Sequence, residues 1–204
     1  MRLVLPVICL FVAALPAGAQ PAAIDRTAAA MAGKEAEFVH RFTPKGFKSS
    51  QVERGSVVFG ALPMMRWSYA APEKKLFVFD GTRSWFYVPA DRQVTVADLD
   101  ERRKSELPFL LIGDAAAREK QFQVREQRRG ARITTTLQPR SAAAAIRTVT
   151  IVTNASTNLI ESLEYIDRDG NRTSFEFSRY HPARTAADTF RFTPPAGVQV
   201  VRAD

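Results

Sequence analysis

The residues that most often carry out chemistry in proteins are few in this sequence, and none stands at the spacing of a common catalytic or metal site. The two histidines, His40 and His181, are far apart, and neither belongs to an H-E-x-x-H pattern. No G-x-S-x-G elbow or glycine-rich phosphate loop occurs. Asp167, Asp169 and Gly170 resemble part of a calcium loop, but the closing glutamate is missing, and Asp-Gly is a common hairpin signal. We therefore expect no metal, no cofactor and no enzymatic activity.

The acidic residues offer one further arrangement that catalysis could use. Asp98, Asp100 and Glu101 stand close enough in sequence to act as paired carboxylates, but three basic residues follow at positions 102–104. Such mixed runs of charge are typical of a solvated loop. A secreted hydrolase with an unrecognised carboxylate site stays an alternative that this pattern does not favour.

A stronger signal is the density of large apolar side chains between residues 57 and 87. At any single position a packed core is the favoured explanation, but sheets that curl can leave room for an apolar ligand between their inner side chains. The candidates for lining a lipid-binding cavity are Val57, Phe59, Trp67, Tyr69, Phe77, Phe79, Trp85 and Tyr87.

Most of the chain has the period of two that is typical of strands. Alternation and turn signals predict about eleven strands in one antiparallel sheet, curled because so many strands must hide their edges. No linker divides these strands, so we expect a single domain over residues 20–204. The expected strands lie at 50–59, 66–69, 75–79, 84–88, 92–96, 122–126, 132–137, 146–152, 159–166, 173–180 and 198–201.

Two segments are expected to be helical. Residues 22–42 are rich in Ala, Met, Glu and Lys, carry an apolar stripe at roughly helical spacing, and end before Pro44. Ser105 can cap a short apolar helix that Gly113 ends. Since this second helix is nearly all apolar, it must be buried or form a lid.

A loop and the short apolar helix supply candidates for the rim and lid of a cavity. Met64 and Met65 precede Trp67 on an expected loop, and methionine side chains repack easily around flexible tails. Phe109, Leu110 and Ile112 would form the underside of the lid.

The first nineteen residues have the pattern of a cleaved secretory signal peptide. Arg2 precedes an apolar run over residues 3–15, and small residues at 17–19 form a cleavage site. A retained membrane anchor is the rival interpretation, but the run is shorter than the roughly 20 residues that span a bilayer. Cys9, the only cysteine, lies within this segment, so we expect a mature chain with no disulfide.

The formal net charge of +8 bears on possible partners. Outside the cytoplasm, a basic surface favours anionic membrane headgroups or an acidic partner protein, and it also simply keeps a protein dispersed. Nucleic acid is not expected as a partner, because the arginines cluster in turns such as Arg128-Arg129 while the aromatic residues follow strand spacing.

Several short motifs occur in an order that resembles the periplasmic lipoprotein-carrier family (LolA-like). The likeness spans nearly the whole expected mature chain, and its specificity comes from the order of the motifs. They are Gly55 before an apolar strand, Arg66-Trp67-x-Tyr69-x-x-Pro72, Asp80-Gly81-Thr82-x-x-Trp85-x-Tyr87-x-Pro89, Gln93-Val94, Leu107-Pro108-x-Leu110-Leu111-x-Gly113, Asp169-Gly170-Asn171 and Phe190-x-Phe192-x-Pro194-Pro195-x-Gly197-Val198-x-Val200.

The resemblance implies an unclosed β-barrel with an α-helical lid over an apolar cavity. It implies a periplasmic carrier that takes acylated lipoproteins from an inner-membrane ABC exporter and hands them to an outer-membrane acceptor lipoprotein, with no nucleotide or metal of its own. A shuttle has little use for assembly, so we expect a monomer. One departure is visible: the family often has an arginine that holds the lid from a loop, at a position near Ala61 here, and this chain has none. The alternative function on the same fold is a sensor of lipids or lipoproteins, or a glycolipid carrier.

Overall fold

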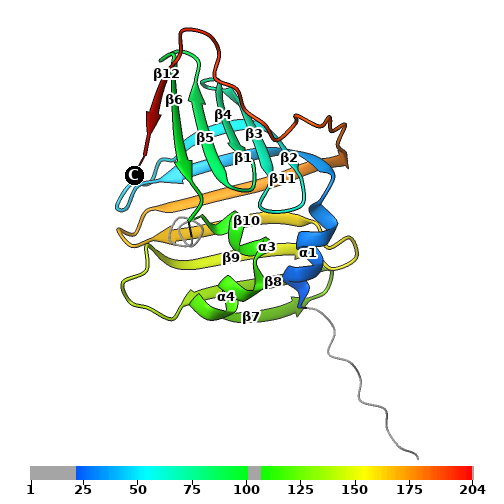
Figure 1. The fold of residues 1–204 in the computed structure, drawn as a ribbon. Coiled ribbons are helices and arrows are strands. Elements are labelled where there is room, and N and C mark those ends of the chain that lie inside the picture. Colours follow the sequence, from blue (N-terminus) through cyan, green and yellow to red (C-terminus); the bar gives the residue numbers. More distant parts are fainter. Residues whose placement is uncertain (1–21, 101–106, 204) are drawn as a thin grey trace, which may run out of the picture.

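The computed structural model of the protein describes residues 22–100 and 107–203, so the expected signal peptide and the proposed cap at Ser105 lie outside the described residues. Within these ranges the chain forms one twelve-stranded sheet, with three helices on one of its faces (Figure 1). The helices are α1 (Ala23–Met31), α3 (Pro108–Gly113) and α4 (Ala115–Gln121). The strands are β1 (Lys34–Thr43), β2 (Gln51–Phe59), β3 (Met65–Ala71), β4 (Lys75–Phe79), β5 (Arg83–Val88), β6 (Gln93–Asp98), β7 (Phe122–Arg129), β8 (Arg132–Pro139), β9 (Ile146–Asn154), β10 (Ile160–Asp167), β11 (Arg172–Pro182) and β12 (Gln199–Arg202).

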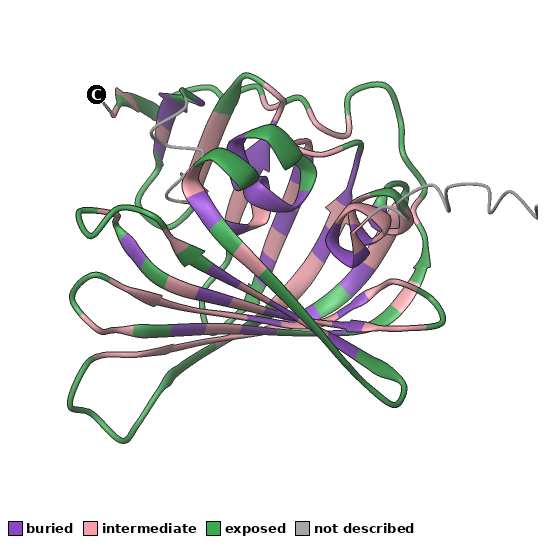
Figure 2. Ribbon diagram, turned by 90° about the horizontal axis from the view of Figure 1, so that it is seen from below, coloured by how far each residue is buried: buried purple, intermediate pink, exposed green. Residues whose placement is uncertain are grey.

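The sheet curls without closing. Its strand order is β12-β6-β5-β4-β3-β2-β1-β11-β10-β9-β8-β7, so β12 and β7 form its two edges. All neighbouring strands are antiparallel except β12, which runs parallel to β6. Viewed from below, the helices lie within the curve of the sheet, where buried and less buried residues alternate along the strands (Figure 2). The expected unclosed antiparallel half-barrel with a helical lid is therefore confirmed.

The expected helix over residues 22–42 is wrong in its second half. The helix α1 ends at Met31, Gly33 has a φ of +72°, and the chain continues as β1. In β1, Ala36 and Phe38 are buried on one face while Glu37 is exposed on the other. Pairing of β1 with β2 on one side and β11 on the other overrides the helix propensity of this Ala- and Glu-rich segment.

A glycine in β2 allows aromatic rings to fill the middle of the inner face. Gly55 lies opposite Phe38 of β1 and Tyr69 of β3, and a Cβ atom at this position would lie 2.0 Å from the Ser68 carbonyl oxygen. With no side chain between them, the rings of Phe38 and Tyr69 meet edge to face at a centroid distance of 4.8 Å. This geometry is a favourable one for aromatic pairs.

The C-terminal segment covers the outer face of the early strands. The ring of Phe192 lies 5.8 Å from that of Trp85 and 5.7 Å from that of Tyr87. Arg66 donates a hydrogen bond from Nη1 to the Thr189 carbonyl at 3.3 Å. The segment then returns to the sheet as β12, so part of the outer face is packed as well as the inner one.

Candidate functional site

A largely apolar pocket of about 200 Å³ lies between the inner face of the sheet and the start of α3. Strands β1, β3, β4, β10 and β11 form its walls, and residues at and just before α3 cover it. The lining residues are His40, Met65, Trp67, Tyr69, Phe77, Phe79, Leu107, Pro108, Phe109, Leu110, Tyr165 and Phe175.

Four of the residues expected to line a cavity do line this pocket: Trp67, Tyr69, Phe77 and Phe79. Two others, Val57 and Phe59, lie beside them on the inner face but are completely buried in the core. The ring of Phe59 packs against Trp67 at a centroid distance of 6.1 Å. These two residues therefore support the wall from within the core and do not line the pocket.

Trp85 and Tyr87 lie on the opposite face of the sheet, which corrects the expectation that they line the hollow. Phe77 stacks on Phe86 at 4.2 Å, so Phe86 is the residue of β5 that shares the inner face with Phe77. Neighbouring residues of a strand point to opposite faces, and Trp85 and Tyr87 accordingly pack against Phe192 outside. Alternation in the sequence separates the two faces but does not say which one is concave.

Of the residues expected at the rim and lid, some line the pocket and others do not. Met65 belongs to β3 and is fully buried in the pocket wall, not on a loop. Met64 precedes the strand and lies near Gly60 and Gly81, away from the pocket lining. Phe109 and Leu110 line the pocket as expected, whereas Ile112 is buried among the core residues behind them.

Phe109 inserts from the lid into the aromatic residues of the sheet. Its ring centroid lies 4.7 Å from that of Trp67, 5.0 Å from that of Phe175 and 5.9 Å from that of Phe177. A cavity of about 150 Å³ holds one benzene ring. The remaining pocket is only slightly larger, so with the lid in this position much of the hollow is occupied by the lid itself.

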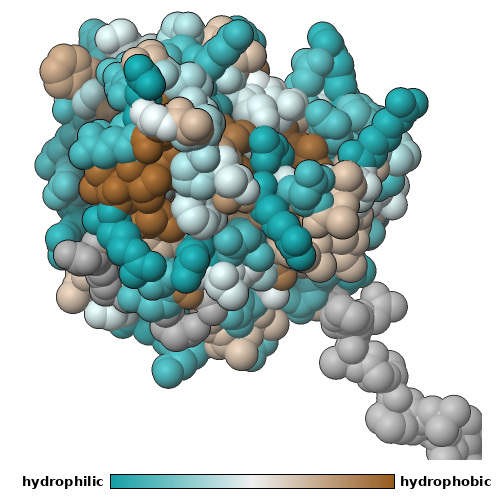
Figure 3. Space-filling model, turned by 45° about the horizontal axis from the view of Figure 1, so that its top comes forward, coloured by the Kyte–Doolittle hydropathy of each residue, from teal (hydrophilic) through white to brown (hydrophobic). Residues whose placement is uncertain are grey.

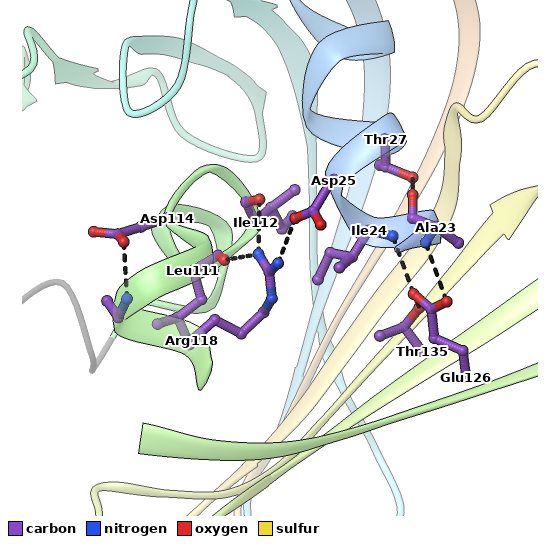
Figure 4. Close-up of polar contacts among 11 residues, drawn as sticks. Ala23, Ile24, Asp25, Thr27, Leu111, Ile112, Asp114, Arg118, Glu126 and Thr135 are labelled. Atoms are coloured by element: carbon purple, nitrogen blue, oxygen red, sulfur yellow. Dashed lines mark hydrogen bonds and ion pairs between the residues drawn. The ribbon is translucent and has the colours of Figure 1, made fainter. Parts of the chain in front are cut away.

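Arg118 joins the three helices of the lid to one another (Figure 4). Its Nη1 donates to the carbonyl oxygens of Leu111 at 3.0 Å and Ile112 at 3.2 Å, at the end of α3. Its Nη2 forms an ion pair with Asp25 of α1. Arg118 itself belongs to α4 and is 1% exposed, and sequence analysis did not single it out. The lid is thus held by an arginine of its own, while the position near Ala61 has none.

A carboxylate from the sheet anchors the beginning of α1 (Figure 4). The two oxygens of Glu126, on β7, accept hydrogen bonds from the backbone N–H groups of Ala23 and Ile24, both at 3.1 Å. Thr135 on β8 donates to the same carboxylate at 3.3 Å. A negative charge at a helix N-terminus satisfies free N–H groups and complements the helix dipole.

The end of α3 is fixed by close packing. Gly113 lies so near the loop between β2 and β3 that a Cβ atom on it would be 2.4 Å from Cβ of Leu62. The helix can approach this loop so closely only because residue 113 has no side chain. This contact and the Arg118 contacts together define the position of the lid.

A charged cluster borders the same pocket where His40 lines it; its other two members, Glu53 and Lys75, lie beside the lining residues. His40 stacks on Phe175 at 4.4 Å with the rings 3° from parallel, and its Nδ1 lies 3.1 Å from a carboxylate oxygen of Glu53. Lys75 forms an ion pair with the other oxygen of Glu53, and its Nζ lies 5.6 Å from the ring centroid of Tyr69. Burial lowers the pKa of His40 despite the opposing effect of Glu53. Burial also raises the pKa of Tyr69, and the Glu53 carboxylate acts in the same direction.

This cluster was not predicted from the sequence, because His40 fell within the expected helix. A signal was available: His40 follows Ala36 and Phe38 at a period of two, which places it on the inner face of a strand.

Among the described residues, no group of three or more His, Cys, Asp or Glu side chains could hold a metal ion. No helix in the described part of the chain is long and apolar enough to cross a membrane.

The molecular surface also carries an exposed hydrophobic patch. Figure 3 shows it framed by hydrophilic side chains, on the side of the molecule where β6 and β12 lie in Figure 1. Framed apolar patches of this kind are typical of binding surfaces.

Comparison with known proteins agrees with this architecture. The sequence model of the family described as outer membrane lipoprotein carrier protein LolA matches residues 30–193. The chain belongs to the LolA family. An outer-membrane lipoprotein carrier protein of Xanthomonas axonopodis pv. citri is 32% identical to this LolA-family chain over 87% of the chain and 86% of the relative. A carrier protein of the same name from Photobacterium profundum is 28% identical over 72% of this chain and 71% of its own.

A solved structure shares the fold. The crystal structure of an uncharacterised conserved protein from Thermus thermophilus matches with a TM-score of 0.53 at 12% identity, covering 89% of this chain and 97% of the other. At this identity the likeness establishes the fold alone. The relatives that share the family are named as carriers, not as enzymes.

Proposed function

We propose that this LolA-family protein is a monomeric periplasmic carrier that shields the acyl chains of lipoproteins in its apolar pocket. It would receive lipoproteins from an inner-membrane ABC exporter and pass them to an acceptor at the outer membrane. The names of the related proteins support lipoprotein cargo. The observation that carries the proposal is Phe109, a lid residue that occupies an aromatic hollow which an acyl chain could fill instead.

The energetic demand on such a carrier is large. Moving one methylene group out of water is worth about 0.8 kcal/mol, so a chain of about fifteen contributes about 12 kcal/mol. A free acyl chain would therefore aggregate or insert into the nearest membrane. The apolar pocket of the carrier has to shield the acyl chain from water during transfer and so offset most of the free energy that exposure would cost.

Release requires that the net free energy of binding is smaller than the free energy gained by burying the acyl chains. The closed pocket of about 200 Å³ is too small for several acyl chains, so binding has to displace the lid and Phe109. The free energy of opening the lid is subtracted from the affinity for cargo. When cargo leaves, Phe109 refills much of the aromatic hollow, so that only the small pocket of about 200 Å³ stays open in the empty carrier.

Native mass spectrometry of the protein secreted by its own host tests the proposal. We expect a fraction of the protein to carry an acylated protein. Recovery of free lipid in place of acylated protein would favour a glycolipid carrier or a sensor on the same fold. A consistently empty protein would contradict both functions.

A pair of variants tests whether the pocket is the binding site. Phe77→Glu places a charge in the pocket wall, while Leu76→Glu places it next to the same residue on the outer face. We expect Phe77→Glu to abolish lipid loading and Leu76→Glu to retain it, because only the first introduces a charge where acyl chains would lie. Circular dichroism establishes that both variants fold. Unchanged loading of folded Phe77→Glu protein would rule out this pocket.

A further inference from the structure

A polar cluster borders the apolar pocket: His40 lines the pocket, Glu53 contacts His40, and Lys75 contacts Glu53 and lies over the ring of Tyr69, which also lines the pocket. The side chains of His40 and Glu53 are each 17% exposed and that of Lys75 is 20% exposed, so all three are largely removed from water. Removing charged and polar groups from water is costly unless they find partners. Polar clusters of this kind at the edge of a pocket mark candidate functional sites.

The hydrogen-bond pattern assigns a state to the histidine. The carboxylate of Glu53 accepts from Lys75 and can only accept from His40, so the proton of a neutral His40 ring resides on Nδ1. The other ring nitrogen, Nε2, then carries a free lone pair. No described residue forms a hydrogen bond with Nε2, and the His40 ring lines the pocket.

Lys75 supplies the complementary function. Its ammonium group has three N–H donors, of which one is directed to Glu53. The cluster therefore combines a free acceptor at His40 with spare donors at Lys75. Its net charge is zero when His40 is neutral, because Glu53 balances Lys75, and an anionic headgroup would meet the Glu53 carboxylate.

We propose that His40 and Lys75, positioned by Glu53, bind the secondary amide that joins an acyl chain to the N-terminus of the cargo. His40 Nε2 accepts the amide N–H, and Lys75 donates to the amide carbonyl. The chain beyond the amide lies among the aromatic residues of the pocket, such as Tyr69 and Phe175, which flank the cluster. This inference rests on the proposed carrier function and specifies which part of the cargo is recognised.

The amide could belong to an acylated peptide, whereas glycerolipids present esters with the same carbonyl but no N–H donor. Three ligands separate these sources: an N-palmitoylated dipeptide, the same dipeptide methylated on the palmitoyl amide nitrogen, and its ester analogue. Affinities are measured with the full mature chain by calorimetric titration. We expect the secondary amide to bind about five-fold more tightly than the N-methyl amide or the ester, since one hydrogen bond is typically worth this much.

Variants assign the two contacts separately. His40→Phe should reduce the preference for the secondary amide to about one-fold while the N-methyl amide binds within two-fold of its normal affinity. His40→Gln, which keeps an acceptor, should restore part of the preference. Lys75→Met should weaken the secondary amide and the N-methyl amide alike, because both retain the carbonyl. The matched controls are His181→Phe and Lys74→Met, at exposed positions outside this pocket.

The outcomes distinguish this inference from the function on which it rests. If the unaltered protein binds none of the three ligands, the proposed carrier function fails. If it binds all three equally, or if folded His40→Phe protein keeps the amide preference, acyl chains are bound but the amide is not recognised by this cluster. An ester that binds as tightly as the amide likewise overturns the role of His40.

Discussion

Arg118 and Asp25 form an ion pair between α4 and α1 in which the arginine side chain is 2% exposed and the aspartate 36%. Leu111 and Ile112 add carbonyl acceptors from α3, so a single guanidinium contacts all three lid helices. The free energy needed to remove the two charges from water offsets much of the free energy of their attraction. The pair therefore fixes how the three helices lie relative to one another.

We predict that Asp25→Asn weakens the closed lid. The substitution leaves the buried Arg118 with no carboxylate, and because Asp25 is partly exposed we expect a loss of about 1–2 kcal/mol in the free energy of unfolding. Urea denaturation measures this loss, and amide hydrogen exchange should accelerate over α3 and α4. Asp98→Asn removes the partner of Arg83 in an exposed pair and should cost less than about 0.5 kcal/mol. Equal effects at the two positions would contradict the role given to Arg118.

The anchor of α1 gives a second prediction. Glu126→Ala removes the acceptor of two backbone N–H groups at the beginning of the helix, a change comparable to the loss of an N-cap. We expect a loss of about 0.5–2 kcal/mol, with faster hydrogen exchange confined mainly to α1. Gln127→Ala, the next position on the same strand, is the control. If α1 exchanges at its normal rate in the Glu126 variant, the carboxylate is not its anchor.

A third prediction concerns the close contact at the end of α3. Gly113→Ala introduces a Cβ atom into a space that Leu62 occupies, so α3 has to move away from the loop between β2 and β3. We expect an apolar fluorescent dye to bind the pocket more readily, because the lid opens at a smaller cost. Replacing Leu62 with Gly removes the atom that the new Cβ meets. The double variant should then bind the dye as the Leu62→Gly protein does. A dye affinity that rises equally with and without Leu62 would show that this contact does not control the lid.

The sequence was sufficient for most of the sheet but not for its central strand. The other strands are marked either by alternation of polar and apolar residues or, at 75–79 and 84–88, by short apolar runs bounded by turn signals. Phe38 and Phe42 are four residues apart, a spacing that fits both one face of a helix and one face of a strand. The neighbouring Ala and Glu residues favour the helix locally. Residues 34–43 form a strand because they hydrogen-bond to β2 and β11, and β11 is remote in sequence.

The site was predictable in its apolar part and not in its polar part. Burial of apolar side chains follows from composition and period, which is why Trp67, Phe77 and Phe109 were found. Trp85 was predicted to lie on the concave face, but it lies on the convex one. The alternation within one strand does not show in which direction the sheet curves. Arg118 resembles an ordinary surface residue of a short helix, and its partner Asp25 is 93 positions away. Only the folded arrangement brings the two together.

The buried His40 gives a prediction for pH. Burial lowers its pKa from 6.5, so the unfolded chain binds this proton more readily than the folded chain does. The free energy of unfolding should therefore fall as the pH is lowered from about 6.5 to the pKa of the folded state, by at most about 1.4 kcal/mol per pH unit from this group. Protonation also places a positive charge beside Lys75, which acts in the same direction as burial. Urea denaturation at intervals between pH 7.5 and 5.0 measures the slope.

The range chosen keeps other groups from obscuring this slope. The pKa values of Asp80, Glu161 and Asp167 are lowered from 3.8, 4.5 and 3.8, so the stability that these carboxylates contribute is lost only at more acidic pH. His40→Phe removes the titrating group, so the free energy of unfolding of this variant should change less between pH 6.5 and 5.0. His181→Phe changes an exposed histidine and should leave the pH dependence of the free energy of unfolding as it is in the unaltered protein. A His40→Phe protein that loses stability as steeply as the unaltered chain would mean that another group takes up the proton, and that the histidine beside Glu53 does not titrate in this range.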